Sequence, residues 1–300
     1  MNWQGVMPAI TTPFEDDGSI DLDFVARHVR WLVEHGCTGI VPCGSLGEGA
    51  TLDPQEKVEL IATCVEALEG KAPVIPGLAA TSTRTAVWLC EQAQAAGAQG
   101  LMILPPYVHK GPDDEIAAHF EAMLAATDLP CMLYNNPPAY GFDAEPAFIA
   151  ELAERHPNLA AVKESSGDVR RVTAVRALCG DRLALFAGLD DMVVEAVVMG
   201  ADGWIAGLVN ALPAESVRLF ELAKAGRFDE AFALYRWFLP LLRLDTLPEF
   251  VQWIKLVQAE VGPQTGLAAT EVLRPPRQPV QGAEREEGLR WIRALLEQER

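Results

Sequence analysis

Residues 73–104 read PVIPGLAATSTRTAVWLCEQAQAAGAQGLMIL. A short apolar run at 73–78 is followed by a turn, by a segment with helical spacing of apolar residues that ends at Gly97, and by a second apolar run at 100–104. This order predicts a strand, a loop and a helix that lead into the next strand. Because both runs are almost continuously apolar, we expect both faces of each strand to be covered, which is typical of a parallel sheet.

The same unit recurs along most of the chain. Short runs rich in Val, Ile and Leu alternate with helical segments, and they lie at 6–10, 39–43, 73–78, 100–104, 130–134, 159–163, 183–187 and 203–209. Their spacing of roughly 20–35 residues is that of a strand–helix module. Eight such modules predict an α/β protein that folds as a closed (β/α)8 TIM barrel. An open, doubly wound sheet is the alternative arrangement.

The strand signal stops after Ala225. Segments 228–242 and 247–261 have helical spacing, the proline-rich stretch LRPPRQPVQG follows at 273–282, and a charged helix is expected over 284–299. We therefore predict a catalytic barrel over residues 1–225 and a C-terminal helical extension, residues 226–300, that packs on the barrel.

The composition limits the possible partners. The 300 residues include 42 acidic and 24 basic side chains, and the net charge of −18 disfavours binding to nucleic acids and to anionic membranes. No run approaches roughly 18 apolar residues and the N-terminus lacks a basic leader, so we expect a cytoplasmic protein without a membrane span. The six cysteines form no CxxC pair, which is typical of reduced thiols and predicts no zinc site.

In a barrel of this kind the reacting groups lie at the carboxyl ends of the strands. Those positions hold no histidine and few carboxylates, which argues against a metal-dependent barrel enzyme. Lys163 alone among the six lysines ends an apolar strand, in LAAVKESSG. Desolvation there would lower the pKa of its amine, and a neutral amine is the nucleophile for imine formation. The alternative is a structural ion pair between Lys163 and Glu164.

Other strand ends supply the rest of the candidate site. Tyr134 ends the preceding strand, and its phenol would transfer the protons that imine chemistry requires, unless it is a core tyrosine bonded to the backbone. A glycine-rich turn, PCGSLGEG at 42–49, lets the backbone approach a carboxylate closely and matches neither nucleotide-binding fingerprint. The candidate substrate-binding residues at strand ends are Thr11, Gly44, Ser45, Leu46, Gly188 and Gly207.

Several motifs point together to one family: GVMPAITTPF at 5–14, GSLGE at 44–48, YNNP at 134–137, VKESSGD at 162–168 and RPPR at 274–277. In order and spacing they resemble the dihydrodipicolinate synthase / N-acetylneuraminate lyase family. The resemblance implies a homotetramer of two dimers, a Schiff base between Lys163 and a 2-oxo acid, and proton transfer by Tyr134. It also implies that Ser45 and Leu46 hold the substrate carboxylate. No cofactor or metal is implied, because the iminium is the electron sink.

The sequence departs from the synthase pattern at three positions. Ala139, a further candidate substrate-binding residue, stands where the synthase has an arginine that binds the carboxylate of the second substrate. Leu46 replaces a second threonine, and Val108 stands where neighbouring subunits exchange a tyrosine. Each lost interaction is worth about 1–3 kcal/mol. The departures argue against 4-hydroxy-tetrahydrodipicolinate synthase activity.

Two longer segments, GWIAGLVNALP at 203–213 and LLRLDTLPEFVQWIKL at 241–256, most resemble 1-pyrroline-4-hydroxy-2-carboxylate deaminases. This implies a small 2-oxo acid or pyrroline carboxylate as partner, with release of water and ammonia to give 2,5-dioxopentanoate. The alternatives are a 2-keto-3-deoxy sugar-acid aldolase or dehydratase, an N-acetylneuraminate lyase-like pyruvate aldolase, a non-catalytic keto-acid binder and a phosphate-binding barrel. A sugar-acid chain would find its polar partners among Asn135, Asn136, Ser165, Asp190 and Asn210.

Overall fold

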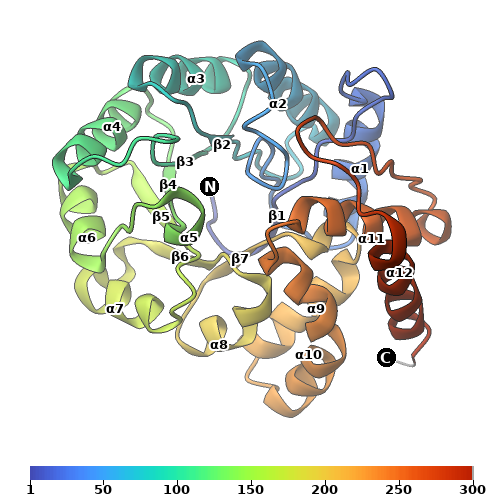
Figure 1. Cartoon of the computed structure of the whole chain (residues 1–300). Helices are drawn as coiled ribbons and strands as arrows, with labels where there is room; N and C mark the ends of the chain where they lie inside the picture. Colours follow the sequence, from blue (N-terminus) through green and yellow to red (C-terminus); the bar gives the residue numbers. More distant parts are fainter. Residues whose placement is uncertain (299–300) are drawn as a thin grey trace.

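Parallel strands line the inside of the fold and helices surround them (Figure 1). The computed structural model describes residues 1–298. Within them the strands pair in the order β1-β7-β6-β5-β4-β3-β2, and every pairing is parallel. Their bounds are β1 (Gly5–Pro8), β2 (Gly77–Leu78), β3 (Leu101–Ile103), β4 (Cys131–Asn135), β5 (Leu159–Glu164), β6 (Ala184–Ala187) and β7 (Gly203–Ala206).

The second of the eight apolar runs, at 39–43, closes the barrel without forming a named strand. Val41 bridges Ala9 on one side, and Ile40 bridges Val74 on the other. Prolines at 42, 73 and 76 have no N–H to donate, which interrupts the ladder here and shortens β2. The run therefore joins β1 to β2 through isolated bridges. The sheet is a closed (β/α)8 barrel, as predicted, and not an open doubly wound sheet.

Helices alternate with the strands around the barrel (Figure 1). Up to residue 224 they are α1 (Leu22–Glu34), α2 (Pro54–Leu68), α3 (Thr83–Ala95), α4 (Asp113–Ala125), α5 (Pro137–Tyr140), α6 (Pro146–Arg155), α7 (Arg170–Cys179), α8 (Val193–Val198) and α9 (Pro213–Lys224). Short 3-10 turns, η1 (Gly180–Arg182), η2 (Asp190–Met192) and η3 (Leu208–Asn210), follow α7, β6 and β7.

The last quarter of the chain is helical. It contains α10 (Phe228–Leu242), the 3-10 turn η4 (Arg243–Thr246), α11 (Phe250–Thr265) and α12 (Gly282–Leu296). The bounds of α10 are those predicted, whereas α11 begins three residues later than predicted because Leu247 and Pro248 belong to the turn before it. The predicted end of the last helix, at 299, lies outside the described residues. In Figure 1, α12 lies outside the ring next to α11, where Gly288 packs on the Trp253 ring.

Large side chains fill the barrel interior. Met7 and Phe186 are fully buried, and Phe186 occupies the space that Gly203 leaves on the neighbouring strand β7. Trp3 packs edge-on against Phe186, so the N-terminal segment covers the end of the barrel opposite to the carboxyl ends of the strands. Within residues 1–298, none of the helices combines the length and the apolar character that crossing a bilayer requires.

Candidate active site

Two reactive side chains stand next to each other at the carboxyl edge of the sheet. Tyr134 on β4 and Lys163 on β5 are register partners, and Lys163 Nζ lies 4.1 Å from the centre of the Tyr134 ring. Both are buried. Burial lowers the pKa of the Lys163 amine to about 8, against a smaller opposite effect of the Asp245 and Asp190 carboxyl groups. About a tenth of the amine is then neutral at pH 7, and the neutral form can attack a carbonyl or imine carbon.

Tyr134 keeps its proton in the resting site. Burial raises the pKa of its phenol to about 12, and the Asn136 side-chain amide donates a hydrogen bond of 2.8 Å to the phenol oxygen. Because Asn136 occupies the oxygen as an acceptor, the hydroxyl hydrogen is available to a ligand. Tyr134 is therefore suited to donate a proton beside Lys163.

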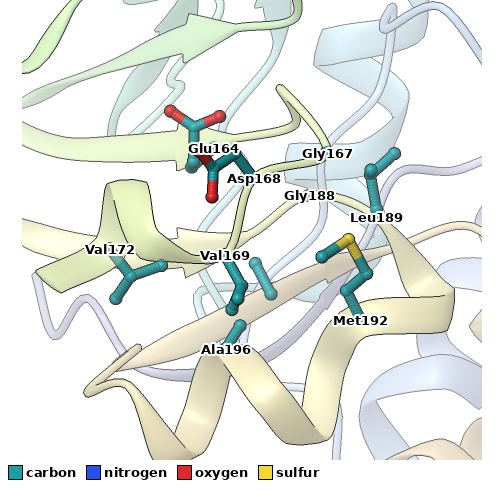
Figure 2. Close-up of a pocket in the computed structure, with 10 residues that line it drawn as sticks. Glu164, Gly167, Asp168, Val169, Val172, Gly188, Leu189, Met192 and Ala196 are labelled. Atoms are coloured by element: carbon teal, nitrogen blue, oxygen red, sulfur yellow. The ribbon is translucent and has the colours of Figure 1, made fainter.

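The structure decides between the two interpretations of Lys163. The Glu164 carboxylate accepts hydrogen bonds from the Ser166 backbone at 2.6 Å and from the Asn135 side chain at 3.0 Å. It lines a separate pocket of about 20 Å³ beside Asp168, with room for about one water molecule (Figure 2). No carboxylate in residues 1–298 forms an ion pair within 4.0 Å of Lys163. Lys163 is therefore not held in a structural pair with Glu164.

The glycine-rich turn forms one wall of the site. Cys43 and Glu48 adopt left-handed φ values of 63° and 53°, and a β-carbon on Gly49 would overlap the Cys43 carbonyl group. In the described part of the chain, no protein acceptor takes the backbone N–H groups of Ser45 or Leu46. Successive N–H groups in such a turn form a site for a carboxylate.

A buried ion pair ties this turn to the C-terminal extension. Lys255 Nζ on α11 donates to Glu48 Oε1 at 2.7 Å, and both side chains are buried. Lys255 also donates to the Val272 carbonyl at 2.7 Å, and the Arg274 backbone N–H donates to Glu48 Oε2 at 3.2 Å. Residues far along the chain therefore fix the conformation of the turn.

A cavity of about 620 Å³ opens above Lys163 and Tyr134. Among the predicted substrate-binding residues it is lined by Gly44, Ser45, Leu46, Ala139, Gly188 and Gly207. The structure does not bring Thr11 into this cavity. Thr11 is 3% exposed, and its hydroxyl donates to Gln258 on α11 at 2.8 Å, so its polar group is used within the protein.

The polar groups predicted for a sugar-acid chain are mostly used by the protein. Asn136 and Ser165 line the cavity, whereas Asn135, Asp190 and Asn210 do not. The Asp190 carboxylate accepts from the Leu208 backbone at 2.8 Å and from the Trp204 indole at 2.9 Å, and burial raises its pKa to about 6. Asp190 therefore holds the turn after β7.

A cluster of phenols, which sequence reasoning missed in part, covers one side of the cavity. The Tyr140 hydroxyl shares a hydrogen bond with the Ser45 hydroxyl, and its ring centre lies 5.7 Å from those of both Tyr107 and Tyr134. Burial raises the pKa of the Tyr140 phenol, so it stays protonated near neutral pH. The position of Tyr140 directly after YNNPPA was the only sequence signal for it.

Two charged cavity residues, Asp245 and Arg277, also escaped prediction. Asp245 lies on η4, and a β-carbon on Gly207 would overlap its carboxyl group, so the glycine gives Asp245 access to the mouth of the barrel. Burial and the neighbouring Asp190 raise the pKa of Asp245 well above its usual value, while Lys163 opposes the rise. Both residues reach the cavity from the C-terminal extension. They stand in the segments 241–256 and 274–277 quoted above for the resemblance, but those segments do not show that the two side chains reach the cavity.

Metal ligation has no candidate site in the part of the chain that the structure describes. Residues 1–298 contain no group of three His, Cys, Asp or Glu side chains placed to ligate a metal ion. His109, the histidine nearest to the barrel mouth in sequence terms, is half-exposed and pairs with Glu115 at 2.7 Å, outside the cavity.

A desolvated lysine, an adjacent phenol and a turn of unpaired N–H groups define a lysine-dependent, class I Schiff-base lyase. The model of the Dihydrodipicolinate synthetase family matches residues 2–295. The chain belongs to this family. Its enzymes bind keto acids such as pyruvate through a covalent Schiff base on lysine and use no external cofactor.

Individual relatives agree with this assignment. The chain is 36% identical over 252 residues to a 4-hydroxy-tetrahydrodipicolinate synthase of Methanoculleus marisnigri, covering 82% of this chain and 86% of the relative. It is 33% identical to the enzyme of that name from Pelobacter propionicus, covering 94% and 95%. A family member from E. coli K12, solved with pyruvate, superimposes with a TM-score of 0.91 at 25% identity, covering 99% of both chains. A dihydrodipicolinate synthase from Bacillus anthracis gives 0.90 at 26% identity over the whole of both chains.

Proposed function

We propose that this enzyme is a 1-pyrroline-4-hydroxy-2-carboxylate deaminase. The observation that supports it best is the set of groups around Lys163. One turn, at Ser45 and Leu46, offers N–H groups to a single carboxylate, and Ala139 adds an apolar side chain to the cavity wall. A compact substrate with one carboxylate fits these walls better than a dicarboxylate does.

The residues of the site supply the first steps of this reaction. The neutral Lys163 amine would add to C2 of the cyclic imine while the N–H groups of Ser45 and Leu46 hold the carboxylate. Tyr134 would give a proton to the ring nitrogen, the bond between C2 and that nitrogen would break, and the nitrogen would remain on C5 as an amine. Lys163 would then hold an open-chain iminium at C2.

The remaining steps remove the hydroxyl and the nitrogen. Loss of the C3 proton and the C4 hydroxyl releases one water and leaves a conjugated iminium. Proton shifts move the unsaturation to the C5–nitrogen bond. Hydrolysis at C5 frees ammonia, and hydrolysis at C2 frees Lys163 and 2,5-dioxopentanoate. One water is lost and two are consumed, so the net reaction takes up one water and releases one ammonia.

The direct test is an assay of the purified protein with this pyrroline. We expect equimolar ammonia and dioxo acid, and no ammonia from a Lys163→Ala variant. Absence of ammonia, together with turnover of a 2-keto-3-deoxy sugar acid, would contradict the proposal.

A second candidate is 4-hydroxy-tetrahydrodipicolinate synthase. Two observations favour it: the relatives at 33% and 36% identity have that name, and Arg277 adds a guanidinium to the cavity wall. Arg277 lies 3.9 Å from Glu48, whose charge Lys255 already balances, and so could attract a second carboxylate. Condensation of pyruvate with aspartate semialdehyde, measured in parallel with ammonia release, separates the two candidates.

The proposal includes a homotetramer of two dimers in the cytoplasm. Val108 supports an assembly, because it is 88% exposed and adopts a left-handed φ of 71° on the loop after β3. A β-branched residue rarely adopts this backbone conformation unless its surroundings hold it there, and a neighbouring subunit would supply such a contact. Light scattering should give the mass of four chains, and a monodisperse monomer would contradict it.

A further inference from the structure

The carboxyl group of Asp245 stands in the catalytic cavity without a protein partner. No cation lies within 4.0 Å of it in residues 1–298, and no hydrogen bond in that part of the chain stabilises it. Elsewhere in the molecule, buried carboxylates such as Glu48 and Asp190 are paired or hydrogen-bonded. Asp245 is half-buried and lines the cavity, so a ligand bound there meets a carboxyl that no protein group occupies.

The residues next to Lys163 support the same conclusion. The Ser165 hydroxyl is buried beside the Tyr134 phenol, and Ser165 lines the cavity. A β-carbon on Gly188 would overlap the Ser165 hydroxyl and press on the Lys163 side chain, so this glycine keeps the space beside the lysine open. Lys163 and Asp245 influence each other's pKa without forming an ion pair. Because both residues line one cavity, a small ligand attached to Lys163 would share that cavity with the Asp245 carboxyl.

We propose that Asp245 is a catalytic residue that moves one proton from C3 to the C4 hydroxyl of the substrate iminium on Lys163. The ligand class is a 2-oxo acid, or its cyclic imine, with a hydroxyl group on C4. This inference rests on the proposed function for the second half of the step, whereas removal of the C3 proton applies to any 2-oxo acid that forms the imine.

The proton and the electrons balance within the step. The Asp245 carboxylate takes the C3 proton, and the C3–H pair forms the C2–C3 double bond of an enamine on Lys163. The nitrogen lone pair of the enamine then restores the C2 iminium, the C2–C3 pair moves to C3–C4, and the C4–O bond breaks. Asp245 returns its proton to the departing hydroxyl, which leaves as water. Asp245 ends as the carboxylate it was, and no oxidant or reductant takes part.

Tyr134 is less suited to this role. Its phenol keeps its proton, with a pKa of about 12, and its oxygen already accepts from Asn136. The Asp245 carboxyl has a raised pKa, because of burial and the neighbouring Asp190, and it accepts and returns a proton more readily than an ordinary carboxylate does. Tyr134 therefore donates the proton to the ring nitrogen, and Asp245 moves the proton from C3 to the C4 hydroxyl.

The test compares Asp245→Asn with a control variant, Asp191→Asn. Asp191 is the nearby carboxylate on η2, outside the cavity, and its closest cation is Arg243 at 3.9 Å. Two measurements use pyruvate as the probe: borohydride trapping at Lys163, followed by mass spectrometry, and exchange of the pyruvate methyl protons in D2O, followed by NMR. A third measures ammonia released from the hydroxypyrroline.

We expect Asp245→Asn to trap pyruvate as the wild type does, which also shows that it folds, but to exchange the methyl protons at least about 100-fold more slowly. Ammonia release should fall by a similar factor, whereas Asp191→Asn should stay close to the wild type, because Asp191 exerts only the smallest of the effects on the Asp245 pKa. Unchanged exchange in Asp245→Asn overturns the inference. Loss of trapping in parallel with exchange also overturns it, because Asp245 would then serve folding or imine formation.

The two proposals can fail separately. If the wild type exchanges pyruvate protons through Asp245 but releases no ammonia from the pyrroline, the deaminase proposal fails and the C3 role of Asp245 stands. If ammonia is released at the wild-type rate by Asp245→Asn, the deaminase proposal stands and the role of Asp245 fails.

Discussion

The pH dependence of imine formation tests the state of Lys163. A pKa of about 8 makes the amine about half neutral at pH 8, about a tenth neutral at pH 7 and about a hundredth neutral at pH 6. Because only the neutral amine attacks, the second-order rate of adduct formation with pyruvate should rise about tenfold per pH unit below pH 8 and level off above it. An ordinary lysine, with a pKa near 10.4, would show no plateau until well above pH 10.

The assay is reductive trapping with cyanoborohydride at low pyruvate, with the adduct quantified on the Lys163 peptide by mass spectrometry. Lys57 is an internal control, because it is also buried and burial lowers its pKa, yet it lies outside the cavity and bonds to the Ala79 carbonyl. Lys57 should remain unmodified at every pH. A rate that keeps rising tenfold per unit through pH 9 would refute the desolvated-amine account.

Three substitutions test other parts of the structure. Gly207→Ala should displace the Asp245 carboxyl and slow ammonia release about 100-fold while pyruvate trapping persists; equal slowing of both would contradict this. Lys255→Met leaves the Glu48 carboxylate buried without its cationic partner. In urea titrations the free energy of unfolding should fall by about 3–5 kcal/mol. Adding Glu48→Gln should recover most of this loss, because the uncharged side chain no longer needs a cation. Tyr140→Phe removes a hydrogen bond to the turn worth about 1 kcal/mol, so kcat/KM should fall about fivefold, and an unchanged value would place Tyr140 outside the mechanism.

The barrel could be predicted because its signal is local and repeated. In each module a short apolar run predicts the strand. Lys163 ends the run at 159–163, so the pattern also places it at the carboxyl edge of the sheet. The extent of each strand was less predictable. Prolines at 42, 73 and 76 leave the pairing at Ile40 and Val41 as isolated bridges, although the apolar pattern there is as strong as elsewhere.

The candidate site was predictable where one segment determines the geometry. Lys163 on β5, Tyr134 on β4 and the glycine-rich turn at 42–49 each lie in a segment whose backbone conformation follows from its own sequence. All three meet at the cavity. Asp245 and Arg277 reach it from the C-terminal extension, so their place in the cavity depends on long-range packing, although both stand in segments quoted for the resemblance. The same limit explains Thr11, which stands at a strand end but meets Gln258 of α11.

A crystal structure of the protein after reduction with pyruvate and borohydride tests the central claim most directly. The account predicts continuous density from Lys163 Nζ to C2 of the bound group, with its carboxylate on the N–H groups of Ser45 and Leu46 and its methyl carbon facing Asp245. An unmodified Lys163, or an adduct whose carboxylate points away from the glycine-rich turn, would contradict it.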